Sequence, residues 1–153
     1  MTQLAANVHC LLLPVETSVL VLPNPAVAEI VDYREPESTT DGPGWFLGWV
    51  PWRGVQVPLV AFESVDGGAC DEQQRLRIAI LNTLNGDPAL PFIGIVLRGI
   101  PRLLNAGSEV IAAMEGPSSG SVTLANVQVA GEAAMIPDLD ALEKLVSGLP
   151  PAA

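Results

Sequence analysis

Two residue types that could serve as base and nucleophile stand side by side near the N-terminus, where His9 precedes Cys10. His9 is the only histidine of the chain, and both residues lie in an apolar run that is typical of a buried strand. Neighbouring residues of a strand point to opposite faces of the sheet, so this thiol and imidazole could not hydrogen bond. The sequence therefore predicts packed or strand-end side chains here, neither a catalytic pair nor a metal site.

The second cysteine, Cys70, lies far from Cys10, and the two show no C-x-x-C or Cys/His spacing. Buried cysteine usually behaves as a small hydrophobic residue. We expect two free thiols, which fits a reducing cytoplasm.

Carboxylates are numerous but are scattered through expected loops. Asp71 and Glu72 fit solvated loop charge, and Asp138 and Asp140 fit the start of a helix. The chain has no P-loop, no G-x-G-x-x-G and no G-x-S-x-G. These observations predict a protein that is not an enzyme and binds no cofactor, although a paired acid/base site could assemble in space.

Glu29 and Arg53 are charged residues in otherwise apolar surroundings. Arg53 precedes Gly54 at the tip of an expected hairpin over Pro43–Phe62, which contains all three tryptophans. A charge among valine, tryptophan and proline is costly unless it is solvated or paired. We therefore expect a carboxylate partner for Arg53, the alternative being a solvated turn arginine.

Short apolar strands must position these residues, and turns or loops separate them. The expected strands cover 8–15, 18–22, the two halves of the hairpin 43–62, 75–81, 91–97, a run from 122 with a break near Ala125, and 133–136 after a turn at Gly131. Residues 26–33 are expected to form a short helical turn that runs into a strand. Residues 138–147 predict a closing helix with Asp138 as N-cap and Gly148 after its end. Its apolar face comprises Leu139, Leu142, Leu145 and Val146.

A polar, glycine-containing connector at 63–74 divides the 153-residue chain into two strand-rich halves. We expect one domain with a first lobe over about 8–62 and a second lobe over about 75–147, closed by the helix 138–147. Two small β-barrels are more natural for this pattern than one large sandwich.

Composition restricts the partners. Seven basic against 17 acidic residues give a net charge of −10, so the chain has no basic stripe for nucleic acid or for anionic lipid. The run Val8–Val15 before Ala26–Ala28 imitates a signal peptide, but residues 1–7 contain no Lys or Arg. No apolar run approaches the roughly 18 residues of a membrane helix. We expect a cytoplasmic protein without direct membrane insertion.

The stretch WFLGWVPWRGVQVPLVAF resembles the signature of the CheW-like domain, in which G-x-x-x-x-RG is followed by V-x-VPLVDL. The matching residues are Gly48, Arg53, Gly54, Val57, Pro58, Leu59 and Val60. Further pieces are similar along nearly the whole chain: CLLLPVETSVLVLP, AVAEIVDY, RIAILN, IGIVLRGI and IPDLDALEKL.

This resemblance implies a mostly β fold of two small five-stranded SH3-like barrels that share a core and carry a C-terminal helix. It also implies a non-catalytic adaptor that couples a chemoreceptor signalling tip to the regulatory domain of a CheA-type histidine kinase, and that contacts other CheW-like proteins. The partner-binding residues implied in this way, with Glu29 and Arg53 as an ion pair, are Val27, Glu29, Trp49, Trp52, Arg53, Gly54, Val57, Arg77 and Gly94.

Several positions depart from the family pattern. Ala61 replaces the usual Asp, Pro51 a common Asn and Arg98 another Asp, while Trp49 and Trp52 are unusually bulky. The chain resembles most the small accessory CheW-like proteins of type IV pilus (twitching) chemosensory systems. A β-barrel that binds a small ligand or catalyses a reaction, and an exported pilus component, are the alternatives.

Overall fold

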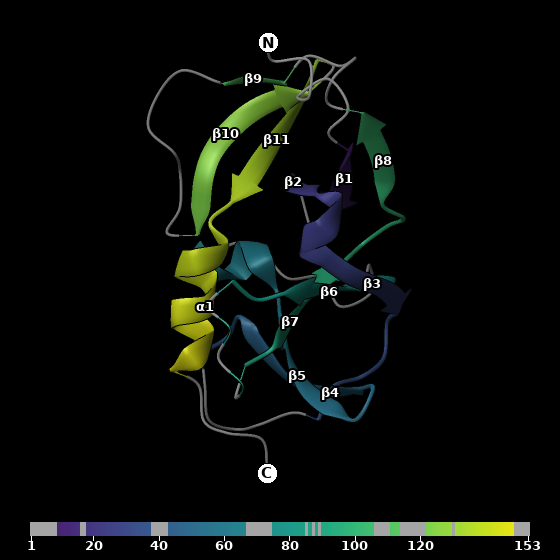
Figure 1. Cartoon of the computed structure of the whole chain (residues 1–153), viewed down its shortest axis with the longest axis vertical. Coiled ribbons are helices and arrows are strands. Elements are labelled where there is room, and N and C mark those ends of the chain that lie inside the picture. Colours follow the sequence, from purple (N-terminus) through teal and green to yellow (C-terminus); the bar gives the residue numbers. More distant parts are fainter. Residues whose placement is uncertain are drawn as a thin grey trace.

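The computed structural model describes residues 9–15, 18–37, 43–66, 75–84, 86, 88, 90–105, 111–113, 122–129 and 131–148. Within these ranges the chain forms two β-sheets, one α-helix and two short 3-10 helices (Figure 1). The helices are η2 (Asn24–Ala26), η3 (Phe62–Asp66) and α1 (Leu139–Ser147).

The first sheet has six strands in the order β8-β1-β2-β11-β10-β9. These are β1 (His9–Pro14), β2 (Val19–Pro23), β8 (Arg102–Asn105), β9 (Ile111–Ala113), β10 (Thr123–Val129) and β11 (Glu132–Pro137). The register of β10 against β11 shifts between Thr123 and Ala125, next to the break that the alternation predicted.

The second sheet has five strands in the order β3-β6-β7-β5-β4. These are β3 (Val27–Asp32), β4 (Phe46–Trp52), β5 (Val55–Val60), β6 (Arg77–Asn82) and β7 (Phe92–Leu97). Strands β4 and β5 form the expected hairpin, and β5 pairs with β7 in parallel. The edges of this sheet are β3 and β4.

The mostly β fold class with a C-terminal helix is confirmed, and one sheet has six strands where five were expected. The expected boundaries of the lobes differ from the distribution of strands between the sheets. The range 8–62 supplies β1 and β2 to the first sheet and β3, β4 and β5 to the second. The reason is long-range pairing, because β1 pairs with β8 and β2 pairs with β11 from the far end of the chain. The connector 63–74 therefore does not separate the two sheets.

The buried residues form three clusters, and one of them joins the two sheets. The largest takes residues from both sheets and from α1, and includes Leu20, Ile95 and Leu142. Each sheet also encloses a smaller cluster of its own, around Val127 in the first sheet and around Ile80 in the second. Burial on both faces explains the nearly continuous apolar sequence of strands such as β7.

Helix α1 packs against the shared core and begins where the sequence predicted. The Asp138 side chain accepts a hydrogen bond of 3.1 Å from the Ala141 N–H, as an N-cap does. The buried face differs from the expected one at two positions, because Leu145 is 39% exposed and Glu143 is buried. The Glu143 carboxylate accepts a hydrogen bond from the Leu84 N–H, which satisfies part of its need for polar contacts.

Candidate functional site

A two-residue turn between β4 and β5 presents Arg53 to solvent. Trp52 pairs with Val55, and the two residues between them, Arg53 and Gly54, have φ angles of 50° and 79°. Two consecutive positive φ angles define a type I′ hairpin turn, for which glycine carries no Cβ penalty. For Arg53 this conformation is sterically unfavourable because its Cβ approaches the following carbonyl oxygen. The Arg53 side chain is 70% exposed. The turn therefore holds a guanidinium at the rim of the five-stranded sheet.

Glu29 of β3 receives two hydrogen bonds from this hairpin at the same oxygen. The Trp52 indole Nε1–H donates to Glu29 Oε1 over 2.8 Å, and Arg53 Nη2 donates to it over 3.3 Å. The Arg53 guanidinium also lies over the Trp52 ring, with 5.0 Å between its carbon and the ring centroid. The expected ion pair of Glu29 with Arg53 is thus present, and Trp52 contacts both of its members.

These contacts join strands at opposite edges of the five-stranded sheet. A second link lies nearby, where Arg34 Nη1 donates a hydrogen bond of 3.1 Å to the carbonyl of Pro51. No ladder of backbone hydrogen bonds joins β3 to β4. We call the junction between these two strands, from β3 through Arg34 on one side and along β4 on the other, the seam.

Pro51 protects the free edge of β4. The backbone N–H and C=O of Trp49 both bond with Glu37, so the backbone groups of odd-numbered residues in β4 face away from β5. Pro51 follows two residues later and has no N–H to expose at this edge, and its carbonyl is occupied by Arg34. Pro51, which stands where the family pattern commonly has Asn, therefore blocks the addition of a further strand at this edge of β4.

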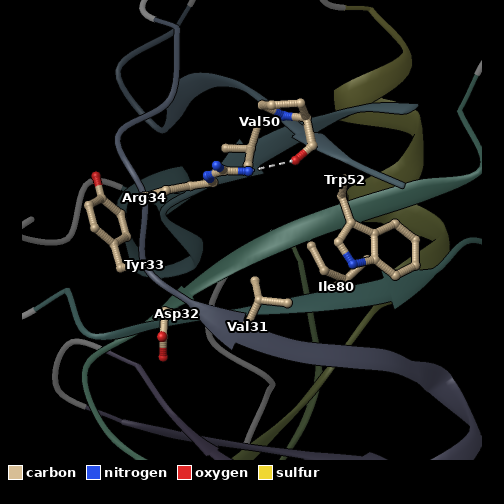
Figure 2. Close-up of a pocket in the computed structure, with 8 residues that line it drawn as sticks. Val31, Asp32, Tyr33, Arg34, Val50, Trp52 and Ile80 are labelled. Carbon is tan, nitrogen blue, oxygen red and sulfur yellow. Dashed lines mark hydrogen bonds between the residues drawn. The ribbon is translucent and has the colours of Figure 1, made fainter. Parts of the chain in front are cut away.

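A pocket of about 330 Å³ opens at the seam (Figure 2). Figure 2 shows Arg34, Trp52 and Val31 on different sides of the pocket, and the dashed line from Arg34 marks its hydrogen bond to a carbonyl, which is that of Pro51. The lining residues are Val31, Asp32, Tyr33, Arg34, Val50, Pro51, Trp52 and Ile80. Its walls are mainly apolar, and the polar side chains of Asp32, Tyr33 and Arg34 line it at the end of β3 and just after it.

The two tryptophans that the sequence singled out have different roles. Trp52 is half-buried, packs against the core of the five-stranded sheet and meets Phe92 edge-on at 4.7 Å between ring centroids. Trp49 is also half-buried and meets Phe46 edge-on at 5.6 Å. Its indole N–H is buried without an acceptor among the described residues. Of these two tryptophans, only Trp52 contacts Glu29 and Arg53.

The other predicted site residues are divided between surface and core. Val57 and Gly94 are buried, so their side-chain positions face packing partners of the fold. A Cβ on Gly94 would lie 3.2 Å from a methyl carbon of Ile78, which agrees with the close approach expected for glycine there. Val27 is half-buried against the shared core. Arg77 forms an ion pair of 3.4 Å with Asp32 and reaches the rim of the seam.

Sequence reasoning missed two arginines at the same place. Arg34 lines the pocket, and Arg75 Nη1 donates a hydrogen bond of 3.4 Å to the Tyr33 hydroxyl. Arg34 lies in a polar segment that predicts only a loop, and the approach of that segment to β4 is a long-range contact. The isolated bridge of Glu37 with Trp49 that holds the segment against β4 has no local sequence signal.

The N-terminal pair is arranged as the alternation predicted. His9 is exposed and Cys10 is buried, and burial raises the pKa of the Cys10 thiol. Among the described residues no group of three or more His, Cys, Asp or Glu side chains could hold a metal ion. Cys70 and the pair Asp71 and Glu72 lie outside the described residues.

None of the helices described is both long and apolar enough to cross a membrane.

Two β-sheets around a shared core, with a terminal helix and a charged seam, define a small two-lobed β protein. The family model of the CheW-like domain matches residues 9–145, and the chain belongs to this family. Among solved structures, the scaffolding protein TtCheW from Thermoanaerobacter tengcongensis has a similar fold, with a TM-score of 0.68. The two are 12% identical, and the match covers 86% of this chain and 88% of the other. The sequence matches none of the curated proteins.

Proposed function

We propose that this protein is a non-catalytic cytoplasmic signalling adaptor that couples chemoreceptors to a CheA-type histidine kinase. Its membership of the CheW-like family supports this function. The single observation that carries the site is the cluster of Glu29, Trp52 and Arg53, which lies at the surface and is joined by hydrogen bonds of 2.8 and 3.3 Å. A fixed charge pair on a rigid sheet favours recognition of a protein surface, because little side-chain entropy is lost on binding.

The partners in this proposal are the regulatory domain of the kinase, the signalling tip of the receptor and other CheW-like proteins. The partner surface comprises the exposed and half-buried residues of the predicted set: Val27, Glu29, Trp49, Trp52, Arg53, Gly54 and Arg77. Val57 and Gly94 support this surface from below because both are buried. A role in pilus-mediated (twitching) motility is the finer part of the proposal and rests on the sequence resemblance.

The substitution Arg53→Asn tests the site without disturbing the turn. Asparagine is favoured in type I′ turns, so the variant removes the guanidinium while keeping the backbone conformation. Capture of the cognate kinase and receptor fragments should fall at least about fivefold, as for an interface residue worth more than about 1 kcal/mol. Arg102→Gln is the matched control, because Arg102 is an exposed arginine of the other sheet that pairs with Glu132 at 2.7 Å. Undiminished capture by a folded Arg53→Asn protein would remove the site from the proposal.

The motility assignment requires a separate experiment. Deletion of the gene should abolish or alter twitching while pili are still assembled, and the wild-type gene should restore it. Normal twitching in the deletion strain would contradict the pilus-specific role and leave the adaptor function to the kinase experiment.

A further inference from the structure

Arginines gather around the seam pocket in a chain that is otherwise strongly acidic. Of the seven basic residues in the whole chain, four arginines either line the pocket or contact a residue that lines it. Arg34 is itself a lining residue. The other three contacts are those of Arg53 with Trp52, Arg75 with Tyr33 and Arg77 with Asp32. By the same criterion, two acidic residues among those that the structure describes belong to this place, because Asp32 lines the pocket and Glu29 accepts a hydrogen bond from Trp52. The four arginines therefore outnumber the acidic residues here, whereas acidic residues outnumber basic ones by 17 to 7 in the whole chain.

The charges of these arginines are only partly neutralised by the described residues. Arg53 pairs with Glu29, and Arg77 pairs with Asp32. Arg34 forms no ion pair with a described residue, and its one described hydrogen bond goes to the neutral carbonyl of Pro51. A carboxylate would be a stronger acceptor for this exposed guanidinium, because hydrogen bonds between charged groups are stronger than those to a carbonyl.

The centre of the pocket is apolar. Val31, Val50 and Ile80 belong to its lining, and Trp52 supplies an aromatic wall. Trp52 is held by Glu29 at its indole N–H and by Phe92 at its edge, so this wall is fixed before a ligand arrives. A volume of about 330 Å³ accommodates a large apolar side chain.

We infer that the seam pocket binds an acidic segment of a partner protein that inserts one bulky apolar side chain between β3 and β4. The apolar side chain occupies the space beside Trp52, and carboxylates on either side of it meet Arg34 and Arg53. The inference deepens the proposed function and rests on it for the presence of a protein partner. An extended segment fits better than a small acid, because the arginines contact four different lining residues and are therefore distributed around the rim.

Pro51 restricts how the segment can bind at the edge of β4. Addition of the segment as a new strand on β4 would need a backbone N–H at the free edge, and Pro51 has none. The contacts are therefore made by side chains, with one apolar anchor and flanking charges.

The test uses the full chain and three synthetic peptides that differ in one property each. These are acetyl-EEFEE-amide, acetyl-EESEE-amide without the aromatic anchor, and acetyl-KKFKK-amide with reversed charge. Binding is followed in ¹⁵N–¹H spectra at the Trp52 indole resonance, which is assigned with Trp52→Phe. The first peptide should shift this resonance, and the other two should bind at least about tenfold more weakly, as expected when one large apolar contact or the favourable charge is lost.

Two variants with one matched control test the location. Arg34→Gln should weaken binding of acetyl-EEFEE-amide about two- to fivefold, the range for an exposed ion pair. Val31→Phe should abolish it by filling the pocket, with the melting temperature recorded to verify folding. Arg102→Gln removes the same charge from the other sheet and should leave the affinity unchanged.

Four outcomes would overturn the inference. They are no binding of acetyl-EEFEE-amide, equal binding of the serine or lysine peptide, equal weakening by Arg102→Gln, and binding of phenylacetate as tight as that of the peptide, which would indicate a small-ligand site. Kinase capture distinguishes this result from the proposed function. Peptide binding without kinase capture contradicts the adaptor function, and kinase capture without peptide binding contradicts only the pocket.

Discussion

The indole of Trp52 donates a hydrogen bond of 2.8 Å to the carboxylate of Glu29, and this bond crosses from one edge strand of the five-stranded sheet to the other. The same carboxylate oxygen accepts from Arg53 at 3.3 Å. Trp52 therefore orients the carboxylate that holds the arginine. An ion pair alone, at an exposure of 70% for Arg53 and 39% for Glu29, would contribute little to stability.

The first prediction compares two tryptophans that differ in this bond. Trp52→Phe and Trp49→Phe each remove an indole N–H and some ring volume, but only the Trp52 N–H has a described acceptor. We expect Trp52→Phe to lower the free energy of unfolding by about 1 kcal/mol more than Trp49→Phe does, the usual value of a hydrogen bond. Urea denaturation measures both. Equal losses would mean that the bond to Glu29 adds no stability.

The second prediction concerns Gly48, a residue of the family signature. Its φ angle is +136°, and a Cβ there would lie 2.1 Å from the carbonyl oxygen of Glu37. That oxygen belongs to the backbone bridge with Trp49, so it cannot move without breaking the bridge. Gly48→Ala should destabilise the protein by at least about 3 kcal/mol, as large effects follow from strain and overpacking.

Gly54→Ala is the control for this substitution. Gly54 also has a positive φ angle, of +79°, but nothing lies within 4 Å of its Cβ position. Only the backbone strain remains, which costs about 1 kcal/mol. Similar melting temperatures for the two variants would show that the approach of Glu37 does not restrict position 48.

Local signals in the sequence were sufficient to predict the hairpin of β4 and β5 and the closing helix. The Arg53-Gly54 step between two β-forming runs predicts the hairpin, because turn chemistry acts over a few residues. Asp138 before an apolar helical stripe predicts the start of α1 for the same reason. The ion pair of Glu29 with Arg53 could be anticipated because a charge in apolar surroundings needs a partner.

The pairing of strands that lie far apart in the chain could not be predicted from the sequence. The assignment of 8–62 to one lobe failed to foresee that β2 pairs with β11, which is more than a hundred residues away. The contacts of Arg34 and Arg75 with the seam depend on how the segment after β3 approaches β4. The hydrophobic pattern of the sequence does not predict this approach. The burial of Glu143 in α1 could not be predicted either, because its hydrogen-bond partner is the Leu84 N–H, which is far away in the sequence.

The third prediction is a pH dependence. Burial raises the pKa of the Cys10 thiol above its ordinary value of 9.0, so the folded state holds the thiol neutral. The stability that this neutral thiol contributes is complete below pH 9.0 and decreases as the pH rises through the raised pKa. In a Cys70→Ser background, the free energy of unfolding should decrease above pH 9 more steeply with Cys10 than with Cys10→Ala.

Thiol reactivity checks the same burial independently. Ellman's reagent at pH 7.5 should react with Cys10 at least about tenfold more slowly in the folded Cys70→Ser protein than in urea, since only the exposed thiolate reacts. A fast reaction of the folded protein would contradict the burial of Cys10.

The fourth prediction tests the buried carboxylate of α1. Glu143 is 4% exposed and accepts from the Leu84 N–H, which fixes the helix to the segment after β6. Glu143→Leu suits the apolar surroundings of this side chain but removes its hydrogen bond with the Leu84 N–H, and the loss of a hydrogen bond to a charged group costs about 1.5–3 kcal/mol. Glu143→Gln keeps a carbonyl oxygen at the same distance along the side chain, so it should cost clearly less.

Hydrogen exchange at the Leu84 amide gives the residue-level measurement for this prediction. The amide should exchange faster in Glu143→Leu than in Glu143→Gln, while the amides in the β1–β2 ladder change only with global stability. If leucine instead stabilised the protein and left Leu84 protected, α1 would be held by its apolar face alone, and the carboxylate would have no structural role.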